Sequence, residues 1–535
     1  MNKLTATLAL SAAALLSASC ADLDEHIVSG VTESYYGTAE GFEAAMNAAY
    51  EPLRSYYGQE RGLTQTVFGT DEFTKGADGS YKYFNDYTPQ LGAGVDFLRD
   101  TWGDFYRAIN TVNVAIAKAP SANVAAATKA IRVGEAKFLR ALYYFDLVRT
   151  FGDIPLPLEP TSGPSTEAVR EPTAKVYEAI IKDLTEAAAA LPLSQSQYGR
   201  ATKGAAQHLL AKVYLTRAAS GDFARAADLG KAVIASGTYS LLPRYADLFV
   251  MGNERNREVV FAVQYTQDPI TTPSGNRQHL YYIMEYDVRP GMMRDVANGR
   301  PFKRWMSTPW LLGLWDRSKD TRYQDTYTDV YFSNNPASIP RRNGVPVYSV
   351  GDTAIWFPGV EISAAERAAR AAKGYEIYTP SQYTNRVFPS VKKFLDPTRT
   401  SLNEERGQRD YVIARLAETY LLVAEALVRD GKAAEAVPFI NTVRERAAKP
   451  GVDPKSMDVT AAQVDLDFVL DERSRELAGE GGRWFDLVRT GKLLERVNKY
   501  NPEAAAGIKP FHVLRPIPTT QIERVTTEFK QNPGY

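Results

Sequence analysis

Hydrophobic residues recur at helical spacing along most of the chain. The first such segment covers about residues 38–55 and opens on Thr38, a residue type that caps helix N-termini. Its apolar positions are Phe42, Ala45, Met46 and Ala49. Because this spacing puts them on one face, the pattern predicts an amphipathic helix with one buried side.

Two longer helices are predicted further along the chain. One begins at about Val95 and carries the apolar stripe Trp102, Phe105, Tyr106, Ile109, Val112 and Ile116. The next covers about residues 122–151 and carries Leu139, Leu142, Tyr143 and Leu147 on one face. We expect it to end at "FGDIPLP", because glycine and proline there do not continue a helix.

Two later segments resemble each other. "LLAKVYLTRAASGDFARAADLGKAV" starts at Leu209, and "RLAETYLLVAEALVRDGKAAEAVPFINTV" starts at Arg415. When about one helical turn is inserted in the first copy, the aligned pairs are Gly221 with Gly431, Ala226 with Ala436, and Val233 with Val443. Small residues between large ones at these positions are typical of tetratricopeptide-type helix hairpins.

The region between the two copies has a different pattern. It is rich in Pro, Asn, Gly, Arg and aromatic residues, and it contains Trp305, Trp310, Trp315 and Trp356. Within it, "EVVFAVQY" (258–265) alternates like a strand, and "GDTAIWFP" (351–358) predicts a second short extended piece. We therefore predict a mostly α fold in one domain over residues 38–535. Its helical scaffold covers about 38–238 and 410–535, and its large loop-rich, partly β insertion covers about 239–409.

The apolar run at the start of the chain has another meaning. Leu4–Leu16 has roughly the length of a signal-peptide core and is too short for a bilayer span, which takes about 20 apolar residues. Small residues then lead to Cys20, the only cysteine, which cannot form an internal disulfide. We predict a lipoprotein signal peptide over residues 1–19, acyl chains on Cys20 and a tether over residues 20–37. The alternative is an ordinary secretory signal in which Cys20 is incidental.

Charge and the absence of catalytic motifs exclude several classes of function. Lysine plus arginine equals aspartate plus glutamate, 63 each, which argues against nucleic-acid binding and against electrostatic binding to membranes. The four histidines do not pair at metal-ligand spacing, and no nucleophile elbow or phosphate loop occurs. We therefore expect no catalytic residues, no metal and no cofactor. Two carboxylates across a cleft would suffice for a glycosidase, but nothing in the sequence marks such a pair.

Tyrosines in polar loops are the main candidates for ligand contact. The chain has 31 tyrosines against 22 phenylalanines. A binding surface combines exposed aromatic rings, on which a flat ligand face can stack, with Asp, Asn, Gln or Arg side chains that hydrogen-bond the ligand. One candidate stretch contains Tyr81, Tyr83, Asn85, Asp86 and Tyr87. The other contains Tyr286, Arg289, Arg294, Asn298, Arg300 and Trp305. The alternative for each ring is packing within its loop, and Trp310 and Trp315 are expected in the core.

Six segments, in order along the chain, resemble the SusD/RagB family of nutrient-uptake lipoproteins. They are "WGDFYRAINTVN" (102–113), "GEAKFLRALYYFDLVRTFGDIPL" (134–156), "RATKGAAQHLLAKVYL" (200–215), "FPSVKKFLDP" (388–397), "RSRELAGEGGRWFDLVRTGKL" (473–493) and "LRPIPTTQI" (514–522). The terminal "QNPGY" also fits, so the resemblance covers essentially the whole chain after Cys20. Trp102 and Trp484 lie in these scaffold segments and are expected in the core.

The resemblance implies a SusD-like fold in which tetratricopeptide-like helix pairs underlie an irregular binding face. It further implies a lipid-anchored outer-membrane protein that faces the exterior and captures oligosaccharides without cleaving them. Its partner would be a TonB-dependent barrel transporter of the SusC type, on which it acts as a lid. "ADLDE" after Cys20 resembles the acidic signal that directs such lipoproteins to the outer face.

Three alternatives stay open at this point. RagB-type members handle peptides, and Arg289, Arg294, Arg300 and Arg304 would suit peptide carboxylates as well as an acidic oligosaccharide. A surface glycoside hydrolase and an intracellular repeat scaffold are the other two.

Charged residues near the C-terminus follow a helical ladder. In "RSRELAGEGGRWFDLVR", Glu476 and Glu480 lie one turn apart, and Arg473 lies three residues before Glu476. Aromatic and aliphatic residues are interleaved with these charges. We expect a partly buried network that pins this segment to the helical layer, with a structural and not a catalytic role.

Overall fold

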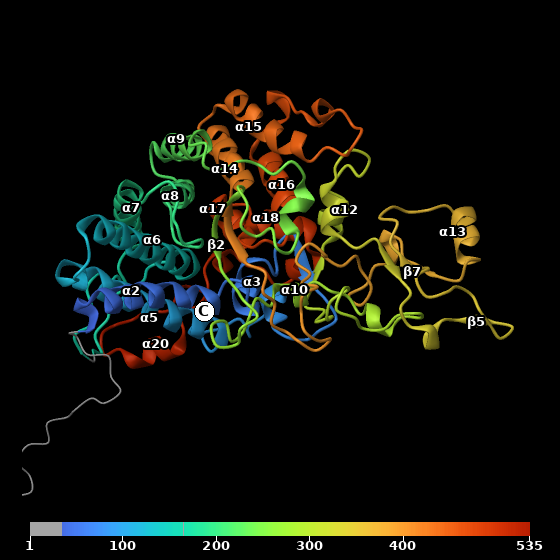
Figure 1. Cartoon of the computed structure of the whole chain (residues 1–535), viewed down its shortest axis with the longest axis horizontal. Coiled ribbons are helices and arrows are strands. Elements are labelled where there is room, and N and C mark those ends of the chain that lie inside the picture. The colour runs from blue at the N-terminus through green and yellow to red at the C-terminus, as the bar shows by residue number, and fades with distance from the viewer. Residues whose placement is uncertain (1–34, 164) are drawn as a thin grey trace, which may run out of the picture.

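The protein has a broad layer of helices with a loop-rich region beside it (Figure 1). The computed structural model describes residues 35–163 and 165–535. This architecture confirms the predicted mostly α fold. The predictions for residues 1–19, for Cys20 and for most of the tether lie outside the described residues. Among the described residues, no helix has the length and apolar character needed to cross a bilayer.

Long helices form the scaffold. They are α2 (Ala39–Tyr50), α5 (Asp96–Lys118), α6 (Ala126–Phe151), α7 (Thr173–Ala190), α8 (Lys203–Arg217), α9 (Asp222–Ala235), α14 (Leu416–Arg429), α15 (Ala433–Arg446) and α16 (Leu466–Leu477). The shorter helices are α3 (Glu60–Thr66), α4 (Tyr83–Asp86), α10 (Gln278–Tyr281), α11 (Pro309–Leu312), α12 (Arg322–Thr326), α13 (Ala364–Ala371), α17 (Arg483–Arg489), α18 (Leu493–Tyr500), α19 (Pro502–Ala505) and α20 (Thr519–Arg524). The predicted N-cap is confirmed, because the Thr38 hydroxyl accepts from the Gly41 N–H at 3.0 Å.

The two repeat-like segments stack side by side although the insertion separates them in sequence. Each helix in the series α5, α6, α7, α8, α9, α14 and α15 packs on the next, so α9 lies directly against α14. Gly221 and Gly431 both take left-handed φ angles, 76° and 77°, in the turns between paired helices. The helix hairpins predicted from the two copies are thus confirmed as α8 with α9 and α14 with α15. The packing of α9 on α14, which the sequence did not predict, joins them into one helical layer.

Four small sheets accompany the helices in the described part of the chain. Antiparallel pairs are formed by β1 (Phe73–Lys75) with β3 (Trp305–Ser307), by β2 (Val259–Val263) with β9 (Tyr411–Arg415), and by β5 (Arg341–Arg342) with β6 (Val345–Pro346). A three-stranded sheet has the order β4 (Val330–Phe332), β7 (Thr353–Trp356), β8 (Glu376–Ile377). The extended pieces predicted over 258–265 and 351–358 are confirmed as β2 and β7.

The insertion has two parts with different cores. Its near part belongs to the main core: Phe261 of β2 meets Phe138 of α6 at a ring distance of 4.9 Å, and Trp305 and Trp315 are buried in the same cluster. Its far part, which includes β4, β5, β7 and α13, has a small core of its own around Tyr331, Ile355 and Phe357. This far part projects to the right in Figure 1, and we call it the wing.

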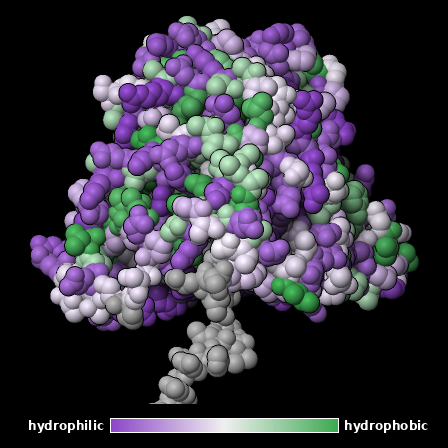
Figure 2. Space-filling view, turned by 60° about the vertical axis from the view of Figure 1, so that its left-hand side comes forward, coloured by the Kyte–Doolittle hydropathy of each residue, from purple (hydrophilic) through white to green (hydrophobic). Residues whose placement is uncertain are grey.

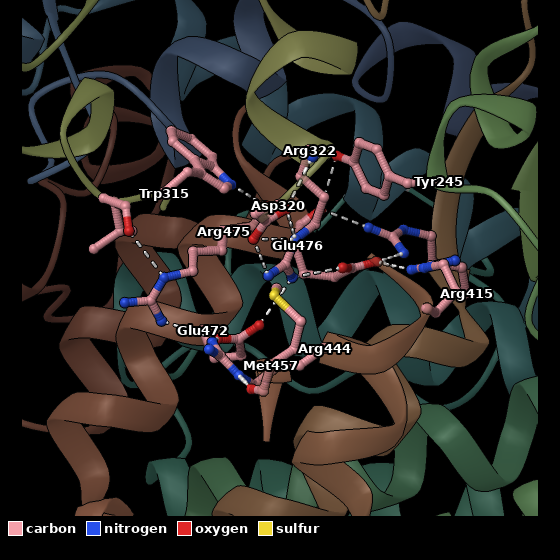
Figure 3. A network of polar contacts seen from close by, with 12 residues as sticks. Tyr245, Trp315, Asp320, Arg322, Arg415, Arg444, Met457, Glu472, Arg475 and Glu476 are labelled. Atoms are coloured by element: carbon pink, nitrogen blue, oxygen red, sulfur yellow. Dashed lines mark hydrogen bonds and ion pairs between the residues drawn. The ribbon is translucent and has the colours of Figure 1, made fainter. Parts of the chain in front are cut away.

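A buried ion-pair network holds the insertion to the scaffold (Figure 3). Arg322, fully buried in α12, donates to Asp320, to Glu472 at 2.8 Å and to Glu476 at 3.0 Å. Glu476 also accepts from Arg415 of β9 at 2.6 Å. Burial alone would raise the pKa of Glu472, but Arg322, Arg475 and Arg444 lower it to about 2.

A second set of pairs fixes the C-terminal segment. Arg473 donates to Asp486 at 2.8 Å, and Arg483 donates to Asp71 of the N-terminal half at 2.7 Å. These side chains are buried, as are Glu476 and Trp484. The network predicted from "RSRELAGEGGRWFDLVR" is therefore confirmed, and it joins segments from both ends of the sequence.

Most of the scaffold surface is polar. The side seen in Figure 2 is largely hydrophilic, and its hydrophobic residues lie singly or in small groups. Scattered apolar groups of this kind are ordinary for a protein surface and mark no site by themselves.

Candidate ligand-binding surface

The two candidate stretches meet in space. β1 follows the helical N-terminal segment and pairs with β3, so that Lys75 lies opposite Trp305. Beyond the pair, the Gly76 N–H donates to the Arg304 carbonyl at 2.9 Å, and the Asp78 N–H donates to the Lys303 carbonyl at 3.1 Å. Residues just after β1 and just before β3 therefore share one surface, although scaffold helices α5 to α9 and the start of the insertion separate them in sequence.

Tyr81 and its neighbours form the aromatic end of this surface. The Tyr81 ring stacks on Phe97, at the start of α5, with centroids 3.9 Å apart, and the Tyr83 ring lies 6.2 Å away from that of Tyr81. All three rings are half-buried. Neither tyrosine hydroxyl hydrogen-bonds to any described part of the chain. Burial raises the pKa of Tyr83 to about 12, so its phenol stays protonated at neutral pH.

Backbone strain holds Tyr81 in place. Its φ is +57°, a left-handed conformation that non-glycine residues seldom take. Lys303, whose carbonyl accepts from the Asp78 N–H, has a φ of +56°. Strained non-glycine residues cluster at ligand sites, and here two of them flank the aromatic end.

An arginine bound to two carboxylates forms the centre. Arg304 donates to Glu60 of α3 and pairs with Asp78 after β1. Burial raises the pKa of Glu60 against the opposing effect of Arg304. The half-buried ring of Phe302 lies between two guanidinium groups, 5.3 Å from that of Arg304 and 5.1 Å from that of Arg300.

Two further arginines, each bound to an acid, form the other end of this surface. Arg300 donates to Glu405 at 2.8 Å and to the Asn403 carbonyl at 2.6 Å. Arg294 pairs with Asp287 at 2.9 Å. We call the whole surface the loop face. Its residues are Glu60, Asp78, Tyr81, Tyr83, Phe97, Asp287, Arg294, Arg300, Phe302, Arg304, Asn403 and Glu405.

Four predicted contact residues lie in the core, and for these the predicted exposure is wrong. Tyr87, Tyr286, Asn85 and Trp305 are at most 3% exposed. Their polar groups bond inside the protein: Tyr87 donates to the Gly69 carbonyl at 2.8 Å, and Tyr286 donates to the Gly299 carbonyl at 2.6 Å. Asn85 accepts from Asn501, and Trp305 packs between Tyr281 and Tyr282. Tyr286 stacks on Tyr331 in the core of the wing, and Tyr87 packs against His512, so different parts of the core bury these side chains.

Of the other predicted residues, Tyr81, Tyr83, Arg294 and Arg300 belong to the loop face. The remaining three lie away from its centre. Asp86 pairs with Lys75 at 3.0 Å, and Asn298 donates to Asp295 at 2.8 Å. Arg289 contacts Tyr378 of the wing at 3.4 Å. Each is half-buried and already bonded, so each supports a loop and has little free polar surface.

The remaining tryptophans agree with the predicted core positions. Trp102, Trp315 and Trp484 are buried. Trp310 is half-buried and stacks on Tyr500 with centroids 4.7 Å apart.

Sequence reasoning missed several residues of the loop face. Phe97 begins a helix and Phe302 directly precedes a basic pair, so neither stood out from its surroundings. Glu60 and Glu405 come from remote segments, and only the fold brings them to Arg304 and Arg300. No local pattern in the sequence would have found these two acids.

The loop face combines half-buried rings and phenols that have no partner in the described chain with charged side chains that are paired to one another. Glu60 and Asp78, for example, both bind Arg304. Over residues 35–163 and 165–535, no group of three or more His, Cys, Asp or Glu side chains is placed to hold a metal ion.

Comparisons with known proteins define the family. The SusD family model matches residues 236–535, and a second model, described as starch-binding associating with outer membrane, matches residues 41–215. Since the first covers more than half of the chain, this protein belongs to the SusD family. The resemblance seen in the sequence is thus confirmed, as is the SusD-like fold.

Individual relatives cover nearly the whole chain. SusD-like protein P2 of Formosa agariphila is 27% identical over an alignment of 541 positions, which covers 96% of this chain and 97% of the relative. The starch-binding protein SusD of Bacteroides thetaiotaomicron is 27% identical over 75% of this chain and 72% of its own. A solved laminarin-binding SusD-like protein superposes with a TM-score of 0.71 at 26% identity, covering 93% of this chain and 100% of that one.

Proposed function

We propose that this protein captures oligosaccharides on the loop face and passes them to a SusC-like, TonB-dependent outer-membrane transporter. Acyl chains on Cys20 hold it to the outer membrane, facing the exterior, and it does not cleave its ligand. Family membership supports this, together with relatives whose names state starch or laminarin binding.

The observation that carries the proposal is the cluster of half-buried rings with free hydroxyls. Tyr81 and Tyr83 can stack on a sugar ring while their phenols and the adjoining side chains bond its hydroxyls. Because the neighbouring arginines already bind carboxylates, no strong unbalanced charge competes with an uncharged ligand.

Peptide binding is the second candidate. It would need arginines that are free to bind peptide carboxylates, yet Arg294, Arg300 and Arg304 of the loop face are all in ion pairs. Of the four arginines singled out in the sequence, only Arg289 has no carboxylate within 4.0 Å in the described part of the chain. This pairing favours sugars over peptides.

An array of neutral glycans and peptides, probed with the mature chain, tests the proposal. We expect binding to at least one class of neutral oligosaccharide, no release of shorter products, and a loss of about tenfold in affinity for Tyr81→Ala. Tyr420→Ala is the matched control, because Tyr420 is also half-buried but lies on α14, outside the loop face. Binding to peptides alone, or equal effects of the two variants, would contradict the proposal.

The anchor and the transporter need tests of their own. Metabolic labelling with palmitate should mark the wild-type protein and not Cys20→Ala. Purification from outer membranes should recover a large barrel protein together with the wild-type chain. An unlabelled protein found in the cytosol would instead support the intracellular scaffold.

A further inference from the structure

A polar cleft lies on the scaffold, away from the residues of the loop face. Its volume is about 520 Å³, within the range of roughly 300–1,000 Å³ common for small-ligand sites. The walls come from α2, from the residues after it, from the loop at 196–200, from Arg255 and from the end of β2. Exposed side chains at Asn47, Gln197 and Arg255 leave it open to solvent.

Three arginines line this cleft, and no aspartate or glutamate does. They are Arg54, Arg200 and Arg255. Arg200 is neutralised, because it pairs with Glu135 at 2.9 Å and with Glu43 at 3.2 Å. The other two have no carboxylate within 4.0 Å in residues 35–163 and 165–535. The cleft therefore carries an excess of positive charge in a protein whose net charge is zero.

Both free guanidinium groups are held in position. The Arg54 Nε donates to the Gln264 carbonyl at 2.8 Å, which leaves its two terminal nitrogens without a partner in the described chain. The Arg255 guanidinium lies 5.3 Å from the centre of the Tyr198 ring. Tyr198 is itself fixed, because its hydroxyl donates to the Glu254 carbonyl at 2.8 Å.

The loop that carries Tyr198 approaches β2 closely. Gly199 has a φ of +88°, and a Cβ there would lie 2.8 Å from the Gln264 side chain. Glycine therefore permits the close approach that places Tyr198 against Arg255. Burial raises the pKa of Asp410, and the nearby Arg255 and Arg54 lower it in part. Asp410 does not line the cleft, however, and its carboxylate accepts a hydrogen bond from the Tyr265 N–H at 2.9 Å.

A second cleft serves as an internal comparison. It has about 450 Å³ and is also lined by three arginines, Arg149, Arg217 and Arg489. Here each is paired: Arg217 with Asp222 at 2.7 Å, Arg489 with Glu425 and Arg149 with Asp146. All three arginines of this second cleft are therefore neutralised, whereas Arg54 and Arg255 in the first cleft are not.

We propose that the 520 Å³ cleft, here called the arginine cleft, binds an acidic sugar residue through Arg54 and Arg255, with the Tyr198 ring against the sugar face. The group recognised is a uronate carboxylate or a sulfate ester. Guanidinium groups bind both through paired N–H donors. This inference rests on the proposed glycan binding and adds a second subsite with its own chemistry.

Calorimetry on the mature chain tests the arginine cleft with matched pairs of ligands. One pair is an oligogalacturonate tetramer and its methyl ester; the other is a sulfated galactan tetrasaccharide and its desulfated form. We expect the charged member of at least one pair to bind at least tenfold more tightly than its neutral partner. Which pair shows the preference distinguishes carboxylate from sulfate recognition.

Variants locate the site. Arg255→Gln should lower the ratio of affinities for the charged and neutral ligands at least tenfold. Arg54→Gln should lower the same ratio. Arg257→Gln is the matched control, because it removes the same charge from an exposed arginine on the same loop that does not line this cleft. Because Arg255 is exposed and makes no hydrogen bond to the described chain, its variant should fold normally.

Two results would overturn the inference. One is equal affinity for charged and neutral ligands. The other is a preference for charge that Arg255→Gln and Arg257→Gln reduce equally, which would indicate diffuse attraction. If neutral glycans still bind with Tyr81-dependent affinity in either case, the proposed function stands and only the arginine cleft is refuted.

Discussion

The loop face and the arginine cleft use the same residue type in opposite ways. On the loop face, Arg300 and Arg304 are bound to Glu405, Glu60 and Asp78, and the groups without a partner in the described chain are the phenol hydroxyls of Tyr81 and Tyr83. In the arginine cleft, by contrast, Arg54 and Arg255 have no acid partner among the lining residues.

Whether the arginines are paired with acids indicates which kind of ligand each surface selects. A paired arginine orients loops and contributes little net charge, so the loop face should discriminate by shape and stacking. An unpaired arginine keeps its charge for a ligand, so the arginine cleft should discriminate by charge. Counting arginines in the sequence could not separate the two cases.

The largest expected effect comes from a change in the buried ion-pair network that joins the insertion to the scaffold. Arg322→Met leaves Glu472 and Glu476 buried without one of their partners, and we expect a loss of about 3–5 kcal/mol in the free energy of unfolding. Urea denaturation measures it. Arg244→Gln is the control, since this arginine is 74% exposed in its pair with Asp247 and should change stability by less than about 0.5 kcal/mol. Similar losses in the two variants would mean that the network does not hold the insertion.

Low pH should also weaken the buried ion-pair network and so lower the stability of the fold. The folded pKa of Glu472, about 2, lies below its usual value of 4.5, so its contribution to stability is complete above pH 4.5 and is lost as the pH falls toward 2. The shift corresponds to about 3 kcal/mol for this buried group. Thermal unfolding at pH 6, 4 and 3 should show a steep decline, and both surfaces should lose ligand together. A midpoint independent of pH over this range would refute the assigned shift.

Removing a ring should affect one surface alone. Tyr81→Ala is expected to weaken binding of a neutral oligosaccharide by about 1–2 kcal/mol, a factor of about 5 to 30. The preference of the arginine cleft for a charged ligand should not change. Calorimetry with one neutral and one charged ligand measures both quantities, and a parallel loss in the two would show that the surfaces are not independent.

The smallest expected effect is a difference in how salt changes the affinities for charged and neutral ligands. At 0.1 M ionic strength charges are screened beyond about 10 Å, so raising sodium chloride from 0.05 to 0.5 M should weaken charged ligands several-fold. Neutral ligands at the loop face should be unaffected, because its charges are paired within the protein. An equal response of both ligand types would contradict the comparison.

Much of the scaffold could be predicted because helical periodicity is a local property. The stripe from Trp102 to Ile116, the N-cap at Thr38 and the repeat around Gly221 and Gly431 are all visible in sequence and present in the fold. The interleaved charges near Glu476 also indicated a buried network.

The ligand surfaces were less predictable, because their residues meet only through tertiary structure. The two candidate stretches meet on one surface, yet Tyr87 and Trp305 are buried while Phe97 and Phe302 are half-buried. Aromatic residues in loops look alike in sequence, and the pairing of β1 with β3 decides which of them face solvent. The arginine cleft gave no sequence signal, because the absence of a nearby acid is a spatial property.

Hydrogen exchange of the mature chain, with and without a saturating neutral oligosaccharide, tests the central claim most directly. The account predicts slower exchange of backbone amides over residues 76–83 and 300–305, and no change at 196–200. Protection confined to the helical scaffold, or spread evenly over the chain, would contradict glycan capture by the loop face.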